Sequence, residues 1–104
     1  MDSSLLETVL VLFNLHRARE YATEGLIVVE GFFTVFEFWQ RRRRNVVALM
    51  GSSMSAEQER LIVETVGKKG RVLLALDNDA AGRTGSADAL KRLSSQVFVR
   101  EMAL

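Results

Sequence analysis

Two aspartates that close an aliphatic run have the residue type and the spacing of a metal site. Asp77 and Asp79 follow the run RVLLAL (71–76), and only Asn78 separates them. In extended chain, side chains two residues apart point to the same side, so both carboxylates can face one point. Such carboxylates suit Mg²⁺ or Mn²⁺, and Mg²⁺ takes few protein ligands and keeps waters for substrate phosphates. The spacing therefore predicts a divalent metal beside a phosphate.

A third carboxylate follows another aliphatic run. Glu30 comes directly after LIVV (26–29), just as the two aspartates come after 71–76. In open α/β sheets, ligands bind beyond the carboxyl ends of the strands. Glu30, Asp77 and Asp79 should therefore converge on one edge, supplied by two different strands. The other two aliphatic runs are followed by Gly51-Ser52-Ser53 and by Arg100-Glu101.

Neighbours of these carboxylates are candidates for contacts with a phosphate or a cofactor. Glycine lets a phosphate or a metal ion come close to the backbone. Ser52 and Ser53 lie in a loop before a predicted helix, where a phosphate contact competes with a purely structural role. The predicted contacts are Gly31, Ser52, Gly82 and Arg83.

Structural roles compete with the other assignments as well. Aspartate after a strand is common turn chemistry, and Asp79 could simply cap the helix that follows it. The run Arg41–Arg44 is interpreted as a solvated helix end whose cations the helix dipole favours, with contact to a phosphodiester backbone as the second interpretation. His16, the single histidine, is assigned no role. The joint placement of three carboxylates after two strands is what favours a metal site.

Composition bounds the classes of function. The 104 residues suffice for one domain, and the formal net charge of +1 means that nucleic-acid binding would need a local patch. The absence of cysteine excludes disulfides, zinc ribbons and thiol catalysis. The N-terminus is acidic and has no small-residue cleavage site, and no apolar run reaches the ~18 residues of a membrane span. We therefore expect a cytoplasmic protein without a signal peptide or a membrane segment.

The elements that would position these residues alternate along the chain. The runs 26–29, 46–50, 71–76 and 97–99 are short, continuous and rich in aliphatic residues, which is typical of strands buried on both faces of a parallel sheet. Helical spacing predicts helices over 32–42, 55–66 and 80–94. The order β-α-β-α-β-α-β predicts a three-layer α/β domain with a mainly parallel four-stranded sheet and right-handed crossovers.

Apolar stripes predict which face each helix buries. The second helix starts with the capping box SAEQ (55–58), carries Leu61, Ile62 and Val66, and stops at Gly67. The stripe predicted for the first helix is Phe32, Val35, Phe36 and Trp39, which leaves Phe33 and Phe38 over. The stripe predicted for the third is Ala87, Leu90 and Leu93.

The first 25 residues are harder to assign. Asn14 is a candidate N-cap of a helix from Leu15 to Thr23 that ends at Gly25. Whether residues 4–12 form a helix or an extended arm stays open. Their apolar residues Leu5, Leu6, Val9 and Leu12 are expected to cover one of the leftover phenylalanines, with docking of a partner as the alternative. We therefore divide the chain into an N-terminal arm or helix (1–25) and one α/β domain (26–104).

Two motifs resemble those of the Toprim domain, the catalytic domain shared by bacterial-type DNA primases, type IA and type II topoisomerases and certain nucleases. VVEG (28–31) resembles its first motif and DNDAAGR (77–83) its second, and the resemblance covers roughly residues 26–100. LFNLHRARE (12–20) and NVVALMGSSMSAEQ (45–58) are most similar to primases. The resemblance implies a Rossmann-like fold, Glu30 as general acid or base, and Mg²⁺ held by Asp77 and Asp79 with Glu30 alongside.

One position departs from the family pattern. Primase-like members usually carry an aspartate four residues after the glutamate, where this chain has Thr34. A further acidic motif often follows the fourth strand, where Glu101 is the one nearby candidate. The leading interpretation is a primase-like Toprim domain that transfers phosphoryl groups on DNA, RNA or nucleotides, with other primase or helicase domains as candidate partners. The alternatives are a stand-alone nuclease and a non-catalytic binding module, and the oligomeric state stays open.

Overall fold

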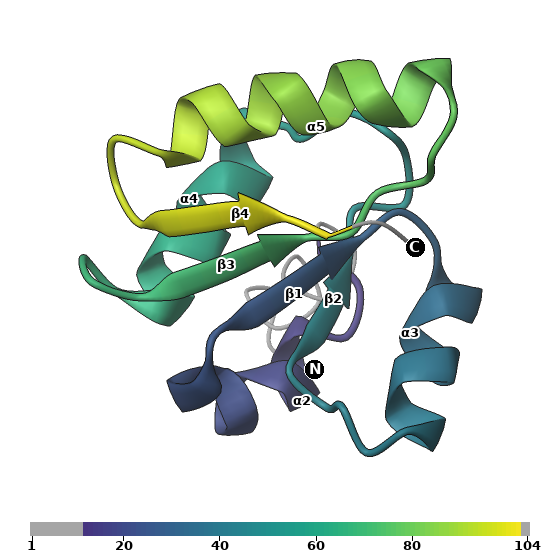
Figure 1. Cartoon of the computed structure of the whole chain (residues 1–104). Helices are drawn as coiled ribbons and strands as arrows, with labels where there is room; N and C mark the ends of the chain where they lie inside the picture. Colours follow the sequence, from purple (N-terminus) through teal and green to yellow (C-terminus); the bar gives the residue numbers. More distant parts are fainter. Residues whose placement is uncertain (1–11, 103–104) are drawn as a thin grey trace.

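The computed structural model describes residues 12–102, and the predicted strands and helices form there in the predicted order (Figure 1). A short α-helix and a 3₁₀ helix precede the first strand. The elements are α2 (Leu15–Ala18), η1 (Arg19–Glu24), β1 (Leu26–Val29), α3 (Phe32–Gln40), β2 (Val46–Ala48), α4 (Ala56–Val66), β3 (Arg71–Leu74), α5 (Ala80–Leu93) and β4 (Phe98–Glu101).

The four strands form one parallel sheet in the order β2-β1-β3-β4, which confirms the predicted α/β fold class. In this order β1 and β3 are the two central strands, with Val28 opposite Val47 on one side and Leu74 on the other. The two predicted motifs therefore follow neighbouring central strands.

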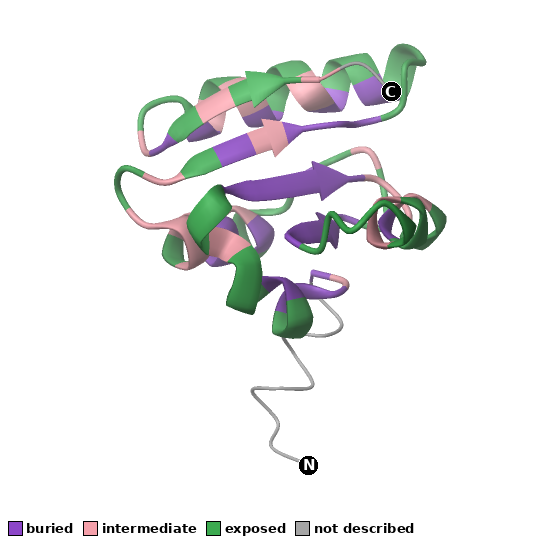
Figure 2. Cartoon of the chain, turned by 60° about the horizontal axis from the view of Figure 1, so that its bottom comes forward, coloured by how far each residue is buried: buried purple, intermediate pink, exposed green. Residues whose placement is uncertain are grey.

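Two apolar clusters lie on opposite faces of the sheet. Alternate residues of β1 enter different clusters, with Val28 in one and Val29 in the other. The larger cluster joins the sheet to α4 and α5 and to the chain before β1, and the smaller joins it to α3. This is the predicted three-layer arrangement, and Figure 2 shows β1 and β2 buried throughout.

The capping box of α4 is confirmed, and it also holds the loop after β2. The Ser55 hydroxyl accepts a hydrogen bond from the Gln58 N–H at 3.0 Å, and the Gln58 side chain accepts one from the Ser55 N–H at 2.9 Å. The Gln58 side-chain amide also donates to the Leu49 carbonyl at 2.9 Å. The helix ends at Gly67, as predicted.

The buried face predicted for α5 is wrong in part, since Leu93 is buried and Leu90 packs against the larger cluster as predicted. Ala87 is exposed, and the buried residues are Gly82, Gly85, Ala89 and Leu93. A search for large apolar residues misses this face because half of it consists of glycines that allow close backbone approach. Arg92 then ties α5 to α4, since its guanidinium donates to Glu59 at 2.7 Å and to the Met54 carbonyl at 2.6 Å.

The apolar stripe predicted for α3 is also wrong in part. Val35 is buried and Trp39 is half-buried, but Phe32 and Phe36 are 37% and 49% exposed. Phe38, which the stripe left over, packs against the smaller cluster. The helix contacts the smaller cluster through Val35, Phe38 and Trp39. The Phe32 ring contacts the rings of Phe13 and Phe33, and the Phe36 ring also contacts Phe13.

The segment before β1 differs from one continuous helix. Asn14 is the N-cap of α2, but its side chain donates to the Val46 carbonyl at 3.0 Å and makes no capping bond to the helix. Its φ of 71° is in the left-handed region that asparagine tolerates. After α2 the chain continues as the 3₁₀ helix η1, which ends at Gly25 as predicted. The φ of Gly25 is 101°. The proposed cover by Leu5, Leu6 and Val9 lies outside the described residues, and Leu12 is buried in the larger cluster.

Across residues 12–102, no helix has the length and the apolar character needed to cross a membrane.

Candidate functional site

Glu30 and Asp77 lie in contact at the carboxyl ends of the two central strands. Glu30 directly follows β1, and Asp77 comes three residues after the last residue of β3. The Glu30 Oε1 accepts a hydrogen bond from the Asp77 backbone N–H at 2.9 Å. The sequence separation of these residues is 47, so the contact is produced by the parallel pairing of β1 with β3. The Asp77 side chain is exposed beside this bond.

Asp79 caps α5. Its Oδ1 accepts a hydrogen bond from the Gly82 N–H at 2.7 Å, which satisfies one of the free amides of the first helical turn. The capping role that competed with metal binding is therefore present in the structure. Asp79 also remains close enough to Glu30 to raise the pKa of that carboxyl by charge repulsion.

Gly82 permits the close packing of α5 against this pair. A Cβ atom at residue 82 would lie 1.9 Å from the Asp77 carbonyl oxygen and 2.7 Å from the Glu30 Oε1. One turn later, a Cβ at Gly85 would lie 1.6 Å from the Ser52 carbonyl oxygen. A Cβ at Gly31, by contrast, would meet no atom within 4 Å. Gly82 thus serves packing of the helix on the site, whereas Gly31 borders open space.

The electrostatic setting of Glu30 disfavours its ionised form. Burial raises the pKa of Glu30, and the nearby charges of Asp77 and Asp79 raise it further. The hydrogen bond from the Asp77 N–H acts in the opposite direction and lowers it, but the net shift is upward. A carboxyl of this kind is suited to holding and releasing a proton.

This shift predicts how Glu30→Gln changes the pH dependence of stability. Because the folded-state pKa is raised, the folded protein binds the Glu30 proton more tightly than the unfolded chain does. The Glu30 contribution is therefore most favourable below the ordinary pKa of 4.5 and is lost as the pH rises through the folded pKa. We expect Glu30→Gln to be at least as stable as the parent at pH 7 and to lose that advantage near pH 4, measured by urea unfolding. A variant clearly less stable than the parent at pH 7 would contradict this.

A shallow hollow opens beside Glu30 and Asp77. It is lined by Glu30, Gly31, Phe32, Phe33, Thr34, Met50, Gly51 and Asp77. Thr34 thus borders the site without bringing a charge.

Met50, which the sequence motifs do not single out, borders the same hollow. Its N–H donates to the Glu30 carbonyl at 2.7 Å, its φ is 63°, and its side chain is 53% exposed. A methionine in the left-handed region is uncommon, and such strain concentrates at functional sites. Met50 is the last residue of the strand predicted over 46–50, whereas β2 ends at Ala48.

The remaining predicted contacts lie in other hollows. Ser52 and Ser53 line one with Thr84, Gly85 and Asp88. Arg83 lines another together with Asp77, Asn78 and Glu101. Glu101 accepts a hydrogen bond from the Ser86 hydroxyl at 3.0 Å. The residues predicted to contact a phosphate therefore lie in separate hollows, and neither Ser52 nor Arg83 lines the hollow beside Glu30.

The carboxylates of Glu30 and Asp77 can supply only part of the coordination shell of Mg²⁺. Within the described part of the chain, no three His, Cys, Asp or Glu side chains are grouped so as to hold a metal ion. Of the three carboxylates expected to converge, those of Glu30 and Asp77 lie at the same point, whereas the Asp79 carboxylate caps α5 by accepting a hydrogen bond from the Gly82 N–H. Mg²⁺ often binds one or two carboxylates and completes its shell with waters and substrate phosphates.

Comparison with known proteins agrees with this architecture. The family model of the Toprim domain matches residues 24–103. The DNA primase of Aquifex aeolicus (strain VF5) is 33% identical over 96 residues, which cover 90% of this chain and 19% of that protein. The DNA primase of Mycoplasma genitalium is 33% identical over 92 residues, covering 88% of this chain and 15% of that protein. The chain thus spans a small part of the length of these relatives.

Solved structures give the same result. The Aquifex aeolicus primase structure with zinc-binding and RNA polymerase domains matches with a TM-score of 0.76 and 33% identity, covering 89% of this chain and 23% of that chain. The DnaG primase catalytic domain bound to single-stranded DNA matches with a TM-score of 0.70 and 28% identity, covering 89% of this chain and 31% of that one. The chain therefore belongs to the Toprim domain family and is similar to the Toprim domains of bacterial DNA primases.

Proposed function

We propose that this Toprim domain supports Mg²⁺-dependent phosphoryl transfer on nucleic acid or nucleotide phosphates, as part of a primase-like protein. The observation that carries the proposal is the hydrogen bond that the Glu30 carboxylate accepts from the Asp77 backbone N–H at the carboxyl ends of the central strands. Ligands of open α/β sheets bind at this edge. The family and its DNA primase relatives support the same chemistry.

The different surroundings of Asp77 and Glu30 suggest different roles for the two side chains. The exposed Asp77 carboxylate is free to hold Mg²⁺, with Asp79 and Glu30 adding negative charge alongside. Glu30 Oε1 is occupied by the Asp77 N–H, so its other oxygen holds or moves a proton as general acid or base. When bound, Mg²⁺ would neutralise charge on the phosphate oxygens and orient them. Gly31, Gly82 and Arg83 remain proposed neighbours of the phosphates, while Ser52 would require a longer substrate.

A non-catalytic binding module is the second candidate function. Thr34 favours it, because this residue lines the hollow beside Glu30 where relatives of this type usually supply a further carboxylate. A module of this kind would bind the metal and nucleic acid without turnover.

Labelled single-stranded and duplex oligonucleotides, incubated with the chain in Mn²⁺ and in Mg²⁺, test the proposal. We expect metal-dependent phosphoryl transfer or cleavage that Glu30→Gln and Asp77→Asn both abolish and that exposed Glu37→Gln on α3 leaves unchanged. We do not expect this chain alone to make primers, because its net charge of +1 provides no broad template-binding surface. Metal binding without turnover would favour the module. Turnover that survives both substitutions would overturn the assigned site.

A further inference from the structure

The chain leaves the sheet after β2 by an irregular step. The Leu49 N–H donates to the Val29 carbonyl at 2.9 Å, and the next amide, that of Met50, donates to the Glu30 carbonyl at 2.7 Å. In a regular strand successive N–H groups point to opposite sides, so two consecutive amides cannot both bond the same neighbouring strand. The chain therefore turns here, with Met50 at φ 63°. The turn provides a hydrogen bond that regular pairing would not, and its acceptor is Glu30.

The left-handed backbone of Met50 lies between two fixed points of the chain. Before it, the Leu49 side chain is buried in the larger apolar cluster, and the Leu49 carbonyl accepts a hydrogen bond from the Gln58 side-chain amide. After it, the Ser52 carbonyl lies against Gly85 of α5, closely enough that a Cβ at residue 85 would lie 1.6 Å from its oxygen. Strained backbone persists where the surrounding structure imposes it. The conformation of Met50 is imposed in this way from both sides.

The other two non-glycine residues with a positive φ among residues 12–102 have ordinary reasons for it. Asn14 is of a residue type that tolerates this region, and Arg42 follows the last residues of α3, where left-handed backbone commonly ends a helix. Met50 ends no helix and is not of a tolerant residue type. Its side chain is 53% exposed, so burial of the side chain does not compensate for the strain either. What the strained conformation provides is the hydrogen bond to Glu30.

Glu30 is consequently held from both neighbouring strands. Its carbonyl accepts the Met50 N–H on the β2 side, and its Oε1 accepts the Asp77 N–H on the β3 side. The residue lies beyond the last paired positions of β1, so regular pairing does not hold its backbone. If the bond from Met50 were lost, rotation of the backbone at residue 30 would swing the carboxylate away from Asp77. A group that transfers a proton must stay within hydrogen-bond reach of it, so this rotation would be costly.

We propose that Met50 is a positioning residue whose left-handed backbone holds Glu30 against Asp77. The role belongs to the backbone conformation of Met50 and not to its thioether side chain. The proposal rests on the proposed function in taking Glu30 as the general acid or base. The hydrogen bond from the Asp77 N–H nevertheless reports the position of Glu30 without metal, substrate or turnover.

Three substitutions of Met50 separate its backbone conformation from its side chain. Met50→Val keeps an apolar side chain, but a β-branched residue is strongly disfavoured at a positive φ. Met50→Gly and Met50→Asn discard the thioether, and both replacement residues adopt a positive φ readily. A role of the side chain would leave the valine variant least affected. A role of the backbone requires the reverse, with the valine variant impaired and the glycine and asparagine variants close to the parent.

The Asp77 amide signal in NMR spectra of the metal-free chain is the first readout. Glu30→Ala removes the acceptor and marks the position of the signal when the bond is absent. We expect Met50→Val to move the Asp77 signal toward that position, whereas Met50→Gly and Met50→Asn leave it where the parent has it. In the oligonucleotide assay, Met50→Val should lower kcat about tenfold while KM changes by less than about twofold. The glycine and asparagine variants should retain the parent kcat.

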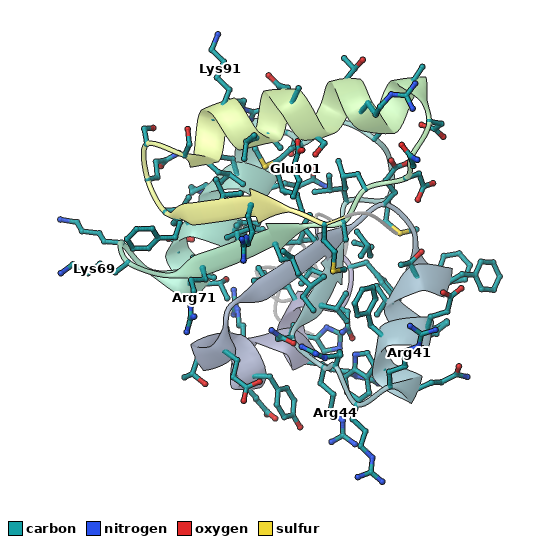
Figure 3. The ribbon with its side chains drawn as sticks, in the orientation of Figure 1. Arg41, Arg44, Lys69, Arg71, Lys91 and Glu101 are labelled. Atoms are coloured by element: carbon teal, nitrogen blue, oxygen red, sulfur yellow. The ribbon has the colours of Figure 1, made fainter. Side chains whose placement is uncertain are left out.

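Arg42→Val is the matched control, because Arg42 has nearly the same φ, 62°, at the opposite end of α3 from Glu30. Figure 3 shows Arg41 and Arg44, which flank this position, at the bottom of the view and away from the carboxyl ends of the strands. Arg42→Val should lower the urea midpoint about as much as Met50→Val and leave the Asp77 signal unchanged.

Two results would overturn the proposal. Met50→Val could lose stability while the Asp77 signal and kcat stay unchanged, which would leave Met50 a structural role only. Alternatively, the Asp77 signal could move as far in Met50→Gly as in Met50→Val, which would assign the role to the side chain. If the Asp77 signal responds as expected but the parent shows no turnover, the positioning of Glu30 holds and the proposed function fails.

Discussion

Gly82→Ala is expected to lower the free energy of unfolding by about 3 kcal/mol. The added Cβ would lie 1.9 Å from the Asp77 carbonyl oxygen, and this neighbour is backbone that cannot rotate away. The first turn of α5 must therefore move off the loop that carries Asp77. On helix propensity alone the same substitution would stabilise α5 by up to about 1 kcal/mol. The expected loss of stability is therefore opposite in sign to the effect that helix propensity predicts.

Two other glycines serve as comparison in the same urea-unfolding experiment. Gly85→Ala should be similarly destabilising, because its Cβ would lie 1.6 Å from the Ser52 carbonyl oxygen. Gly31→Ala should change stability by no more than about 0.5 kcal/mol, since its Cβ meets nothing within 4 Å. If Gly82→Ala proved as stable as Gly31→Ala, α5 would not pack on the Asp77 backbone as closely as the structure shows.

Asp77→Asn is expected to weaken Mg²⁺ binding by about tenfold or more while leaving the fold intact. The parent affinity should already be weak, in the millimolar range or about 4 kcal/mol, because Thr34 brings no carboxylate to the site. The Asp77 side chain is exposed and repels Glu30, so its neutralisation should leave stability unchanged or slightly raised. Isothermal titration and thermal melting measure the two effects separately.

Asp79 provides the matched comparison. Asp79→Asn keeps a good N-cap and removes only the charge, so the fold should stay stable with a smaller loss of metal affinity. Asp79→Ala removes the bond to the Gly82 N–H and should cost about 1 kcal/mol of stability. If Asp77→Asn instead destabilised the protein strongly with unchanged metal binding, Asp77 would have a structural role only.

The strands and their succession along the chain were predictable because each run is continuous, aliphatic and bounded by polar or glycine residues, whereas the strand order within the sheet was not predicted. The capping box at Ser55 and the stop at Gly67 were predictable because local hydrogen bonding determines both. The meeting of Glu30 with Asp77 followed from parallel pairing of neighbouring strands, a rule that needs no side-chain detail.

Features that depend on tertiary packing were not predictable from these patterns. The buried face of α5 contains Gly82 and Gly85, and a hydrophobic pattern cannot indicate that backbone atoms of other segments fill their space. The left-handed φ of Met50 has no residue-type signal. Asn14 has the residue type of an N-cap but uses its side chain on the Val46 carbonyl.

Paramagnetic broadening by Mn²⁺ in two-dimensional NMR spectra of the chain tests most directly whether the metal binds at the carboxyl ends of β1 and β3. We predict that substoichiometric Mn²⁺ broadens first the amide signals of Gly31, Asp77 and Asn78, while those of α4 and of Phe98 stay sharp. Asp77→Asn should remove that selectivity. Broadening that is uniform, or that centres on exposed carboxylates of α4 such as Glu57 and Glu64, would contradict a metal site at this edge of the sheet.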